Sequence, residues 1–356
     1  MSIAKLRKAV DSIDAKILTL LNKRAKVILD IGKLKAKRKE SVYVPDREKD
    51  VYDKLIAKNK GPLSKESIRA IFREVMSSAL SLEKPLEIAY LGPELTFTHT
   101  AALKKFGSSV SYIGCETITD VFAEVEKGRA DYGVVPIENS IEGAVNHTFD
   151  MFVDSDVKIC SEVFLEISHS LLSKDADKTR IVKVYSNPQV FGQCRLWLEA
   201  NLPKIELVEV SSTAKAAEKA SKEKGAACIA NESASKRYAL KVLYRSIEDS
   251  THNVTRFLVI GKASGKPTKE DKTSIMLSVK DKVGALHDIL VPFKRHGINL
   301  TKIESRPSKV RAWEYYFFVD MEGHYSDPKV SLALEELRKE TMYLKILGSY
   351  PAGEAI

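Results

Sequence analysis

The first forty residues carry a regular stripe of apolar side chains. Residues 2–39 contain no proline and a single glycine, Gly32, so little in this stretch interrupts a helix. Apolar residues recur there at the three- and four-residue spacing of one helix face: Leu6, Val10, Ile13, Ile17, Leu20, Leu21, Ile28, Ile31 and Leu34. The pattern predicts one helix about 55 Å long.

Two shorter helices are predicted next, over Asp46–Asn59 and Ser64–Ser81, with a break at Gly61-Pro62 between them. They are too short to cover the whole apolar stripe of the first helix. Pairing with a second copy of the chain is the simplest way to bury the remainder, so we expect a homodimer or a homotetramer.

From Leu86 onward, just after Pro85, short strands alternate with helices. The predicted strands are Leu86–Leu91, Tyr132–Pro136, Lys183–Ser186, Glu206–Val210 and Ala226–Ala230, and the predicted helices are Thr98–Phe106, Thr119–Lys127, Gln189–Asn201 and Thr213–Lys222. This order is typical of an α/β domain with mainly parallel strands. Its length of about 175 residues predicts two lobes that face a cleft, where α/β folds usually bind ligands.

The last part of the chain follows a polar, Gly- and Pro-containing linker at residues 262–272. The predicted elements are Thr273–Val279, Leu286–His296, Leu300–Ser305, Trp313–Met321, Pro328–Lys339 and Met342–Ser349. They read β-α-β-β-α-β, which is the ferredoxin-like order. The chain is therefore expected to be a multidomain protein, with an all-α domain over residues 1–84, a two-lobed α/β domain over 86–262 and a ferredoxin-like βαββαβ domain over 273–350.

Composition narrows the class of protein. The 356 residues are 44% hydrophobic and 29% charged, which is typical of a globular protein of two or three domains. A net charge of +9 suits nucleic acid or a small anionic substrate, but no nucleic-acid-binding motif is present. The four cysteines have no metal-like spacing, and no apolar run is long enough to span a membrane. We expect reduced cysteines, a cytoplasmic location, and neither a nucleic-acid nor a membrane partner.

Cations interrupt the stripe of the first helix. Arg24 and Lys35 are eleven residues apart, about three turns, so they can face one pocket. Arg7 lies far along the axis and about 100° around from Arg24, so it reaches a partner subunit's pocket more easily than its own. The alternative is that all three are ordinary solvated cations on a basic helix.

The first segment resembles the all-helical class of chorismate mutase over residues 1–84. The resemblance is carried by Leu6-Arg7, Asp14, Arg24, Gly32, Lys35, Pro45, Arg47-Glu48, Phe72 and the helix that ends at Glu83. It implies that Arg24 and the partner subunit's Arg7 hold the two carboxylates of chorismate, a geometry that suits bidentate arginine. It also implies that Lys35 donates to the ether oxygen, that Glu48 binds the ring hydroxyl, and that Arg47 supports Glu48.

Glu83 departs from relatives that carry Gln at this position. Gln donates a hydrogen bond at any pH, whereas Glu donates one only when protonated. If Glu83 faces the ether oxygen, mutase activity should need the neutral carboxyl and fall as the pH rises. The alternative is an exposed carboxylate at a helix end.

The middle segment carries an unusual run of functional groups in Val134-Val135-Pro136-Ile137-Glu138-Asn139-Ser140. With four further pieces it resembles prephenate dehydratase over residues 86–262. The other pieces are Tyr90-Leu91-Gly92-Pro93 with Thr96-Phe97, Ser186-Asn187-Pro188-Gln189 with Gln193-Cys194-Arg195, Ser211-Ser212-Thr213-Ala214 and Asn253-Val254-Thr255-Arg256-Phe257.

This resemblance implies roles for the residues of the five pieces. Thr255 would donate a proton toward the departing ring hydroxyl of prephenate, the difficult part of the dehydration. Anchors for the side-chain carboxylate would come from Arg256, Ser212, Thr213 and backbone N–H groups. The residues expected to orient or line the substrate are Glu138, Asn139, Gln193, Ser186, Gln189, Thr96 and Phe257, the first three with a catalytic part. Leu95 and Asn187 depart from the common Gly and His of this family.

The last segment resembles an ACT regulatory domain of the kind that binds phenylalanine, over residues 273–350. The motifs are Asp281-Lys282-Val283-Gly284-Ala285-Leu286, Ile298-Asn299-Leu300 and Glu304-Ser305-Arg306-Pro307. The candidate phenylalanine-binding residues are Gly284, Ala285, Leu286, Asn299, Leu300, Glu304, Ser305, Arg306 and Pro307. The resemblance implies binding at an interface between domains, with Glu304 or nearby carbonyls taking the ammonium group.

These resemblances together predict a bifunctional enzyme that converts chorismate to prephenate and then to phenylpyruvate, inhibited by phenylalanine. Neither a metal nor an organic cofactor is implied. A non-catalytic amino-acid sensor and a dehydratase that prefers arogenate are the two alternatives, and no residue in the sequence decides between prephenate and arogenate.

Overall fold

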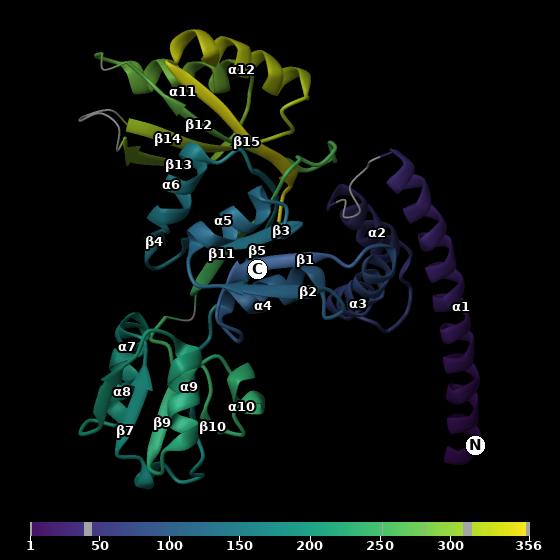
Figure 1. Cartoon of the computed structure of the whole chain (residues 1–356), viewed down its shortest axis with the longest axis vertical. Coiled ribbons are helices and arrows are strands. Elements are labelled where there is room, and N and C mark those ends of the chain that lie inside the picture. The colour runs from purple at the N-terminus through teal and green to yellow at the C-terminus, as the bar shows by residue number, and fades with distance from the viewer. Residues whose placement is uncertain (1, 39–44, 251, 281, 309–314, 354–356) are drawn as a thin grey trace. The chain divides into compact units, whose positions relative to one another are not determined.

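The computed structural model describes residues 2–38, 45–250, 252–280, 282–308 and 315–353. The chain divides into two compact units, Met1–Glu87 with Lys105–Tyr112 and Ile88–Lys104 with Ile113–Ile356. Figure 1 labels most of the helices and strands along the chain.

The first unit is built around three helices, as predicted: α1 (Ile3–Arg38), α2 (Pro45–Lys58) and α3 (Lys65–Glu83). Ser64 begins α3, and its side chain accepts a hydrogen bond from the backbone N–H of Ser67. Gly32 allows the end of α3 to approach α1, because a Cβ atom at Gly32 would lie 2.5 Å from Cγ of Glu83.

Much of the apolar stripe of α1 is exposed in the single chain. The exposed fractions are 44% for Leu6, 54% for Ile13, 48% for Ile17 and 63% for Leu20. A helix with this much uncovered apolar surface needs a partner. The predicted homodimer stays a prediction, and this exposed stripe supports it.

The second unit contains two mixed sheets that share the middle of the chain. The first has the order β2-β1-β3-β11-β5, with β4 paired to β3. Its strands are β1 (Glu87–Leu91), β2 (Ser111–Cys115), β3 (Tyr132–Asn139), β4 (Gly143–Ala144), β5 (Lys158–Glu166) and β11 (Val254–Gly261), and its helices are α4 (Phe97–Phe106), α5 (Ile118–Glu126) and α6 (Asn146–Asp154).

The second sheet has the order β10-β6-β9-β7-β8. Its strands are β6 (Ser170–Ser173), β7 (Lys183–Ser186), β8 (Glu206–Glu209), β9 (Ala226–Ala230) and β10 (Lys241–Tyr244), and its helices are α7 (Pro188–Gln193), α8 (Arg195–Asn201), α9 (Thr213–Lys222) and α10 (Ser233–Arg237), with the 3₁₀ turn η1 (Lys178–Arg180). The two sheets give the two predicted lobes.

The expectation of mainly parallel strands is wrong. In the first lobe, β11 runs antiparallel to both β3 and β5, and in the second, β6 runs antiparallel to β9 and β10. The reason is connectivity, because the chain leaves the first lobe after β5 and returns to it as β11, whose pairing was not evident from local pattern.

The predicted helix over Gln189–Asn201 is also divided, into α7 and α8. Cys194 leaves the helical conformation, with φ −115° and ψ 17°. The carboxylate of Asp249 then accepts hydrogen bonds from the backbone N–H groups of Leu196 and Trp197, at 3.0 and 3.2 Å. A side chain distant in sequence therefore starts α8 as a new helix.

The third sheet has the order β13-β14-β12-β15, all antiparallel, which confirms the ferredoxin-like prediction. Its elements are β12 (Asp271–Ser278), α11 (Ala285–Arg295), β13 (Leu300–Pro307), β14 (Tyr315–Glu322), α12 (Pro328–Glu340) and β15 (Tyr343–Pro351). Trp313, where the third strand was expected to begin, lies outside the described residues.

The two faces of this third sheet have different neighbours. On one face, Ile275 and Val319 pack with Ile289 and Phe293 of α11 in a separate core. On the other face, Met276, Phe318 and Leu347 join the core of the first lobe, with Ile137 and Phe149 among its members. The ferredoxin-like sheet and the first lobe therefore share one hydrophobic core.

Candidate active sites

Lys35 and Glu83 meet in the first unit. Nζ of Lys35 lies 3.6 Å from Oε1 of Glu83, and the Glu83 side chain is only 5% exposed. Within the described part of the chain, Oε1 of Glu83 is buried and makes no hydrogen bond. Gly32 leaves the room that this buried carboxyl occupies. The two residues predicted to act on the same ether oxygen are thus side by side.

The other residues predicted for this site are only partly assembled in one chain. Arg24 is half-buried, and burial together with the charge of Arg47 lowers its pKa. Arg47 itself is exposed, and Oε2 of Glu48 lies 2.9 Å from Nζ of Lys105. Arg7 is exposed and lies about 26 Å from Arg24 along α1, so a single chain does not bring these two arginines together.

In the second unit, the end of β3 meets the start of β11 at Asn139 and Thr255. Nδ2 of Asn139 donates a hydrogen bond to Oγ1 of Thr255 at 2.8 Å. Oδ1 of Asn139 accepts from the backbone N–H groups of Ile141 and Glu142, at 2.9 and 3.0 Å, which fixes the orientation of the amide. Because Asn139 donates, the hydroxyl hydrogen of Thr255 is left to donate to another group.

Further amides extend this network away from Thr255. Nδ2 of Asn139 also donates to Oδ1 of Asn253 at 2.7 Å, and Nδ2 of Asn253 donates to Oε1 of Gln193 at 3.3 Å. Nε2 of Gln193 donates to Oε1 of Glu142 at 2.6 Å. Each amide is therefore oriented by the next one, and Gln193 of the second lobe is connected to Thr255 of the first.

His169 completes the network and was missed by sequence reasoning. Its Nε2 lies 2.7 Å from Oε1 of Gln193, an acceptor, so Nε2 carries the hydrogen. The side chain is 1% exposed and its Nδ1 makes no hydrogen bond within the described residues. Burial lowers the pKa of His169 despite the opposing effects of Gln193, Glu248 and Glu142. A single histidine between Ser168 and Ser170 gave no local signal of this role.

The remaining hydroxyls predicted for this site are bonded to the nearby backbone. Oγ of Ser186 donates to the carbonyl of Ile229 at 2.9 Å, and Oγ1 of Thr96 donates to the carbonyl of Leu91 at 3.2 Å. Gln189 is exposed at the start of α7. Ser186 and Thr96 therefore act on the shape of the backbone around the site.

Two helix starts belong to the same group of predicted residues. Oγ of Ser212 accepts from the backbone N–H of Lys215 and so caps α9, whose first residue, Thr213, is buried. Asn187, one of the two departures noted above, caps α7 and also donates to the carbonyl of Ser211. Asn187 therefore stabilises the start of α7 and joins it to the residues just before α9.

Leu95, the other departure, adopts a positive φ of 69°. This conformation is sterically costly for a residue with a side chain. The backbone N–H of Leu95 donates to Nδ1 of His99 at 3.1 Å, and the side chain packs against a core of the second lobe. These contacts hold the strained turn in place.

Glu138 and Arg256 are directed away from Thr255, contrary to the grouping expected from the sequence. Glu138 pairs with Arg256, and Asn139 with Thr255, as neighbouring positions of β3 and β11. Successive side chains of a strand point to opposite faces, so Glu138 and Arg256 share the face opposite to Asn139 and Thr255. Phe257 is buried at 2% exposure.

The residues expected to bind phenylalanine lie at an edge of the third sheet. Gly284 has φ +80° at the start of α11, and Leu286 is 45% exposed while Ala285 is buried. Nδ2 of Asn299 donates to Oε1 of Glu322 at 3.0 Å, and Leu300 is half-buried. Exposed apolar surface at a sheet edge suits an interface with another domain.

The last four residues of the edge strand β13, residues 304–307, alternate between its two faces. Glu304 and Arg306 are half-buried, whereas Ser305 and Pro307 are exposed. Nη2 of Arg306 lies 3.4 Å from Oδ1 of Asp150 in α6, which places the half-buried face toward the first lobe. The predicted ligand residues are therefore divided between the two faces of the strand.

Two further properties of the described residues concern metal ions and membranes. No group of three or more His, Cys, Asp or Glu residues there is suited to hold a metal ion. None of the helices in this part of the chain combines the length and the apolar character that a membrane crossing requires.

Three family models match the chain. They are chorismate mutase type II over residues 6–84, prephenate dehydratase over residues 88–265 and the ACT domain over residues 273–339. A chorismate mutase domain and a prephenate dehydratase domain in one chain, followed by an ACT domain, define a bifunctional enzyme.

Whole-chain relatives identify the family. The bifunctional chorismate mutase/prephenate dehydratase of Aquifex aeolicus is 52% identical over 353 residues, or 98% of each chain. The protein of the same name from Pseudomonas aeruginosa is 47% identical over 352 residues, which cover 97% of this chain and 96% of that one. The chain belongs to the family of bifunctional chorismate mutase/prephenate dehydratases.

Solved structures are similar to the second unit. The prephenate dehydratase of Arthrobacter aurescens in complex with L-Phe has a TM-score of 0.69 at 33% identity, covering 75% of this chain and 90% of that one. The prephenate dehydratase of Staphylococcus aureus has a TM-score of 0.65 at 29% identity, covering 74% of this chain and 100% of that one.

Proposed function

We propose that this chain rearranges chorismate to prephenate, converts prephenate to phenylpyruvate, and is inhibited by phenylalanine. The observation that carries the proposal is the oriented hydrogen bond from Asn139 to Thr255. It leaves the hydroxyl hydrogen of Thr255 able to donate to a substrate, next to amides that hydrogen bonds hold in one orientation. Family membership over nearly the whole chain supports an enzyme over a non-catalytic sensor.

For the mutase reaction, we assign Lys35 and neutral Glu83 to the ether oxygen of chorismate. Negative charge grows on this oxygen as its bond to the ring carbon breaks, and two preorganised donors stabilise that charge. The buried Oε1 of Glu83, which makes no hydrogen bond to described residues, supports this role. Lys35 at 3.6 Å is close enough to share one ligand atom with it.

The carboxylates of chorismate are assigned to Arg24 and to the partner subunit's Arg7. Arg24 is half-buried beside Arg47, and this concentration of positive charge favours a dianion. The distance along α1 prevents Arg7 from reaching the same site in one chain. Glu48, supported by Arg47, is assigned to the ring hydroxyl. The mutase site is therefore proposed to require two copies of the chain.

For the dehydration, Thr255 donates a proton to the ring hydroxyl, which leaves as water, while the ring carboxylate departs as carbon dioxide and its bonding electrons make the ring aromatic. The Thr255 oxygen then regains a proton from solvent. Asn139 and Gln193 hold the donor in place, and Ser186, Gln189 and Thr96 shape the surrounding backbone. The backbone N–H groups at the start of α9, with Ser212 and Thr213, are assigned to the side-chain carboxylate of prephenate. Phe257 supports the strand from within the core.

Phenylalanine is proposed to bind at the edge of the ACT domain, at an interface between two copies of the chain. Gly284–Leu286 of one copy would form one side of this site, and residues of β13 from the other copy would form the opposite side. The exposed Leu286 and Ser305 support a site that a second copy completes. Inhibition follows if phenylalanine binds one arrangement of the dehydratase better than another.

A cytoplasmic location, as expected from the cysteines, remains a prediction.

One set of assays tests the whole proposal. Chorismate loss and phenylpyruvate formation are followed in purified protein, with and without phenylalanine, and prephenate and arogenate are then compared as direct substrates. We expect both reactions to occur, the second to slow in phenylalanine, and prephenate to be preferred. Protein that leaves both chorismate and prephenate unchanged would refute the proposal.

A further inference from the structure

Arg256 is a buried cation next to the proposed proton donor. It follows Thr255 directly in β11, and its side chain is 8% exposed. Its Nε donates to Oε2 of Glu162 in β5 at 2.7 Å, and its Nη1 donates to Oδ2 of Asp320 in β14 at 2.6 Å. One guanidinium therefore binds a carboxylate from the first lobe and one from the ACT sheet.

A closed ring of hydrogen bonds surrounds the contact between Arg256 and Asp320. Nη2 of Arg256 donates to the Tyr350 hydroxyl at 3.0 Å, and that hydroxyl lies 2.7 Å from Oγ of Ser274. Oγ of Ser274 donates to Oδ1 of Asp320 at 2.6 Å, so Tyr350 is the donor to Ser274. Burial raises the pKa of Tyr350 well above its ordinary value, which keeps this hydrogen in place.

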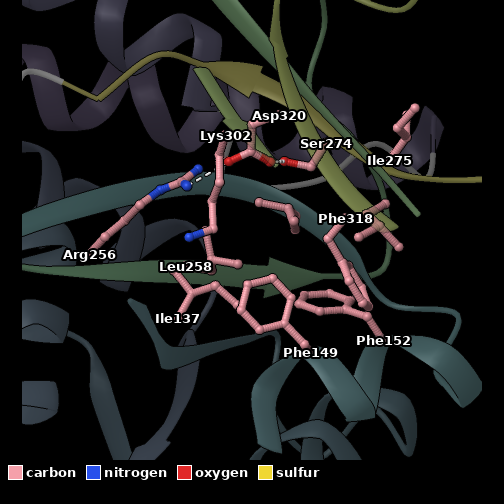
Figure 2. A pocket seen from close by; sticks show the side chains of 12 residues that line it. Ile137, Phe149, Phe152, Arg256, Leu258, Ser274, Ile275, Lys302, Phe318 and Asp320 are labelled. Atoms are coloured by element: carbon pink, nitrogen blue, oxygen red, sulfur yellow. Dashed lines mark hydrogen bonds and ion pairs between the residues drawn. The ribbon is translucent and has the colours of Figure 1, made fainter. Parts of the chain in front are cut away.

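Figure 2 shows how closely these groups approach one another, with Arg256 on β11 directed toward Asp320 and Ser274 of the ACT sheet and Lys302 beside them. They line a cavity of about 20 Å³. The Arg256 and Asp320 side chains are only 8% and 11% exposed, so solvent screens this ion pair weakly. The interactions are correspondingly sensitive to small shifts between β11 and the ACT sheet.

Lys302 makes a second charged contact between the same two regions. Its Nζ lies 2.6 Å from Oε1 of Glu138, and the Lys302 side chain is 13% exposed. Glu138 is the residue before Asn139, which orients the Thr255 hydroxyl. Lys302 belongs to β13, two residues before Glu304. A displacement of β13 would therefore shift Glu138, the residue next to Asn139 in β3.

The contact between the ACT sheet and the first lobe does not need the charges of Arg256, Asp320 and Lys302 for its stability. Phe149, Phe318 and Leu347 already pack together there in a common core. Buried ion pairs contribute little net stability compared with apolar residues of the same size, and they impose a specific geometry. The charges are therefore better explained by a need for one defined register between β11, β3 and the ACT sheet.

We infer that Lys302, with the ring of Arg256, Asp320, Ser274 and Tyr350, couples the ACT domain to the dehydration site. Lys302 and Arg256 are positioning residues in this scheme. Through Glu138 and β11 they transmit a shift of the ACT sheet to Asn139 and Thr255, whose placement without phenylalanine is fixed by the hydrogen bonds of Asn139 itself. The candidate effector residues Ser305 and Pro307 lie on the same strand as Lys302 but on its opposite face, so in this scheme a ligand bound to them acts on Lys302 by shifting β13. The inference rests on the proposed inhibition by phenylalanine.

Lys302→Met in the full chain tests the inference, with Lys345→Met as the matched control. Nζ of Lys345 also joins the ACT sheet to the first lobe, through the carbonyls of Phe152 and Ser155 at 3.1 and 2.7 Å. Its side chain is 12% exposed, close to the value for Lys302. Within the described part of the chain, the Nζ contacts of Lys345 are with residues 152–156 and none is with β3 or β11, so this variant reports on the loss of a mostly buried lysine alone.

We expect Lys302→Met to keep phenylalanine binding, measured by calorimetry, and to keep basal dehydratase kcat and KM. The phenylalanine concentration for half inhibition should rise by about tenfold or more, the size of a typical coupling between sites. Lys302→Arg should restore inhibition, and Lys345→Met should behave as the unmodified chain. Ser274→Ala, which opens the ring without removing a charge, should weaken inhibition as well.

Two outcomes overturn the inference. If Lys302→Met and Ser274→Ala are both inhibited at the concentration that inhibits the unmodified chain, the coupling does not pass through these residues, and the proposed function stands. If the unmodified chain binds no phenylalanine or is not inhibited by it, the proposed regulation fails, and the inference fails with it.

Discussion

The two candidate active sites of this chain differ in how much of the site one copy supplies. The dehydration site is assembled from β3, β11 and α7, and its amides and His169 are linked by hydrogen bonds within one chain. The mutase site places Lys35 beside Glu83 but leaves Arg7 far away on an exposed helix. The dehydratase activity should therefore be a property of the single chain, whereas the mutase activity should depend on pairing.

The largest effect is expected from Thr255→Ala, which removes the proposed proton donor. Dehydratase kcat should fall by about 10²- to 10⁴-fold, the usual contribution of a positioned acid or base. Mutase activity, measured as chorismate loss in the same sample, should stay unchanged. Thr255→Ser keeps the hydroxyl and should recover part of the rate. Dehydration at an undiminished rate in Thr255→Ala would exclude this residue as the donor.

Ile17→Glu tests whether the mutase site needs a second copy. Ile17 is 48% exposed in the single chain, so a charge there should spare folding and prevent burial of the α1 stripe. Mutase activity should fall by at least about tenfold at low protein concentration and recover in part at high concentration. Dehydratase activity should persist, and sedimentation should show a smaller species.

Ser12→Glu is the control for this experiment. Ser12 is exposed on α1, roughly 140° around the helix from Ile17, so its added charge lies away from the apolar stripe. It should leave both the assembly and the mutase activity as they are. An Ile17→Glu protein with normal mutase activity and unchanged size would contradict the two-copy site.

A smaller effect is expected from Glu83→Gln, and it concerns pH. The mutase rate of the unmodified chain should fall as the pH rises, because a Glu side chain donates a hydrogen bond to the ether oxygen only in its neutral form. Gln donates at any pH, so the variant should keep its mutase rate over the same range. Dehydratase activity provides the internal control. Identical pH profiles for the two proteins would remove Glu83 from the ether oxygen.

The smallest effect is expected from His169→Gln, and it concerns stability. Burial lowers the pKa of His169, so the unfolded chain takes up this proton more readily than the folded one. The stability from neutral His169 is complete above the unfolded-state value of about 6.5 and is lost as the pH falls below it.

Thermal unfolding followed from pH 7.5 to pH 5 measures this effect. His169→Gln should lose less stability over the range than the unmodified chain, while its dehydratase rate at pH 7.5 stays within a few-fold. The pKa of His99 is also lowered by burial, but His99 is present in both proteins, so their difference reports on His169. If the stability of the two proteins changed equally with pH, protonation of His169 would not contribute to the loss of stability at low pH.

Local pattern predicted much of the fold. The apolar spacing of α1, the strand Lys183–Ser186, the helix Thr213–Lys222 and the strand Ala226–Ala230 were all predicted with the bounds observed or close to them. These elements carry their own signals in periodicity, caps and breaks. The division at Cys194 was not predictable in this way, because the cap on α8 comes from Asp249.

The same distinction applies to the sites. Asn139 and Thr255 were expected together from their motifs, and the structure places them 2.8 Å apart. Arg256 and Glu138 belong to the same motifs, yet they face the ACT domain because neighbouring side chains of a strand alternate. His169 had no motif at all, and only the fold brings it to Gln193.

The amino-acid sequence by itself determined the order of the three modules, most of their helices and strands, and the chemical groups available to each site. Short-range periodicity and backbone preferences are sufficient for that. Only the tertiary structure decided which face of β11 each side chain occupies and which distant residues it meets. Strand pairing joins segments more than a hundred residues apart, and a shift of one residue would exchange Thr255 for Arg256 at the site.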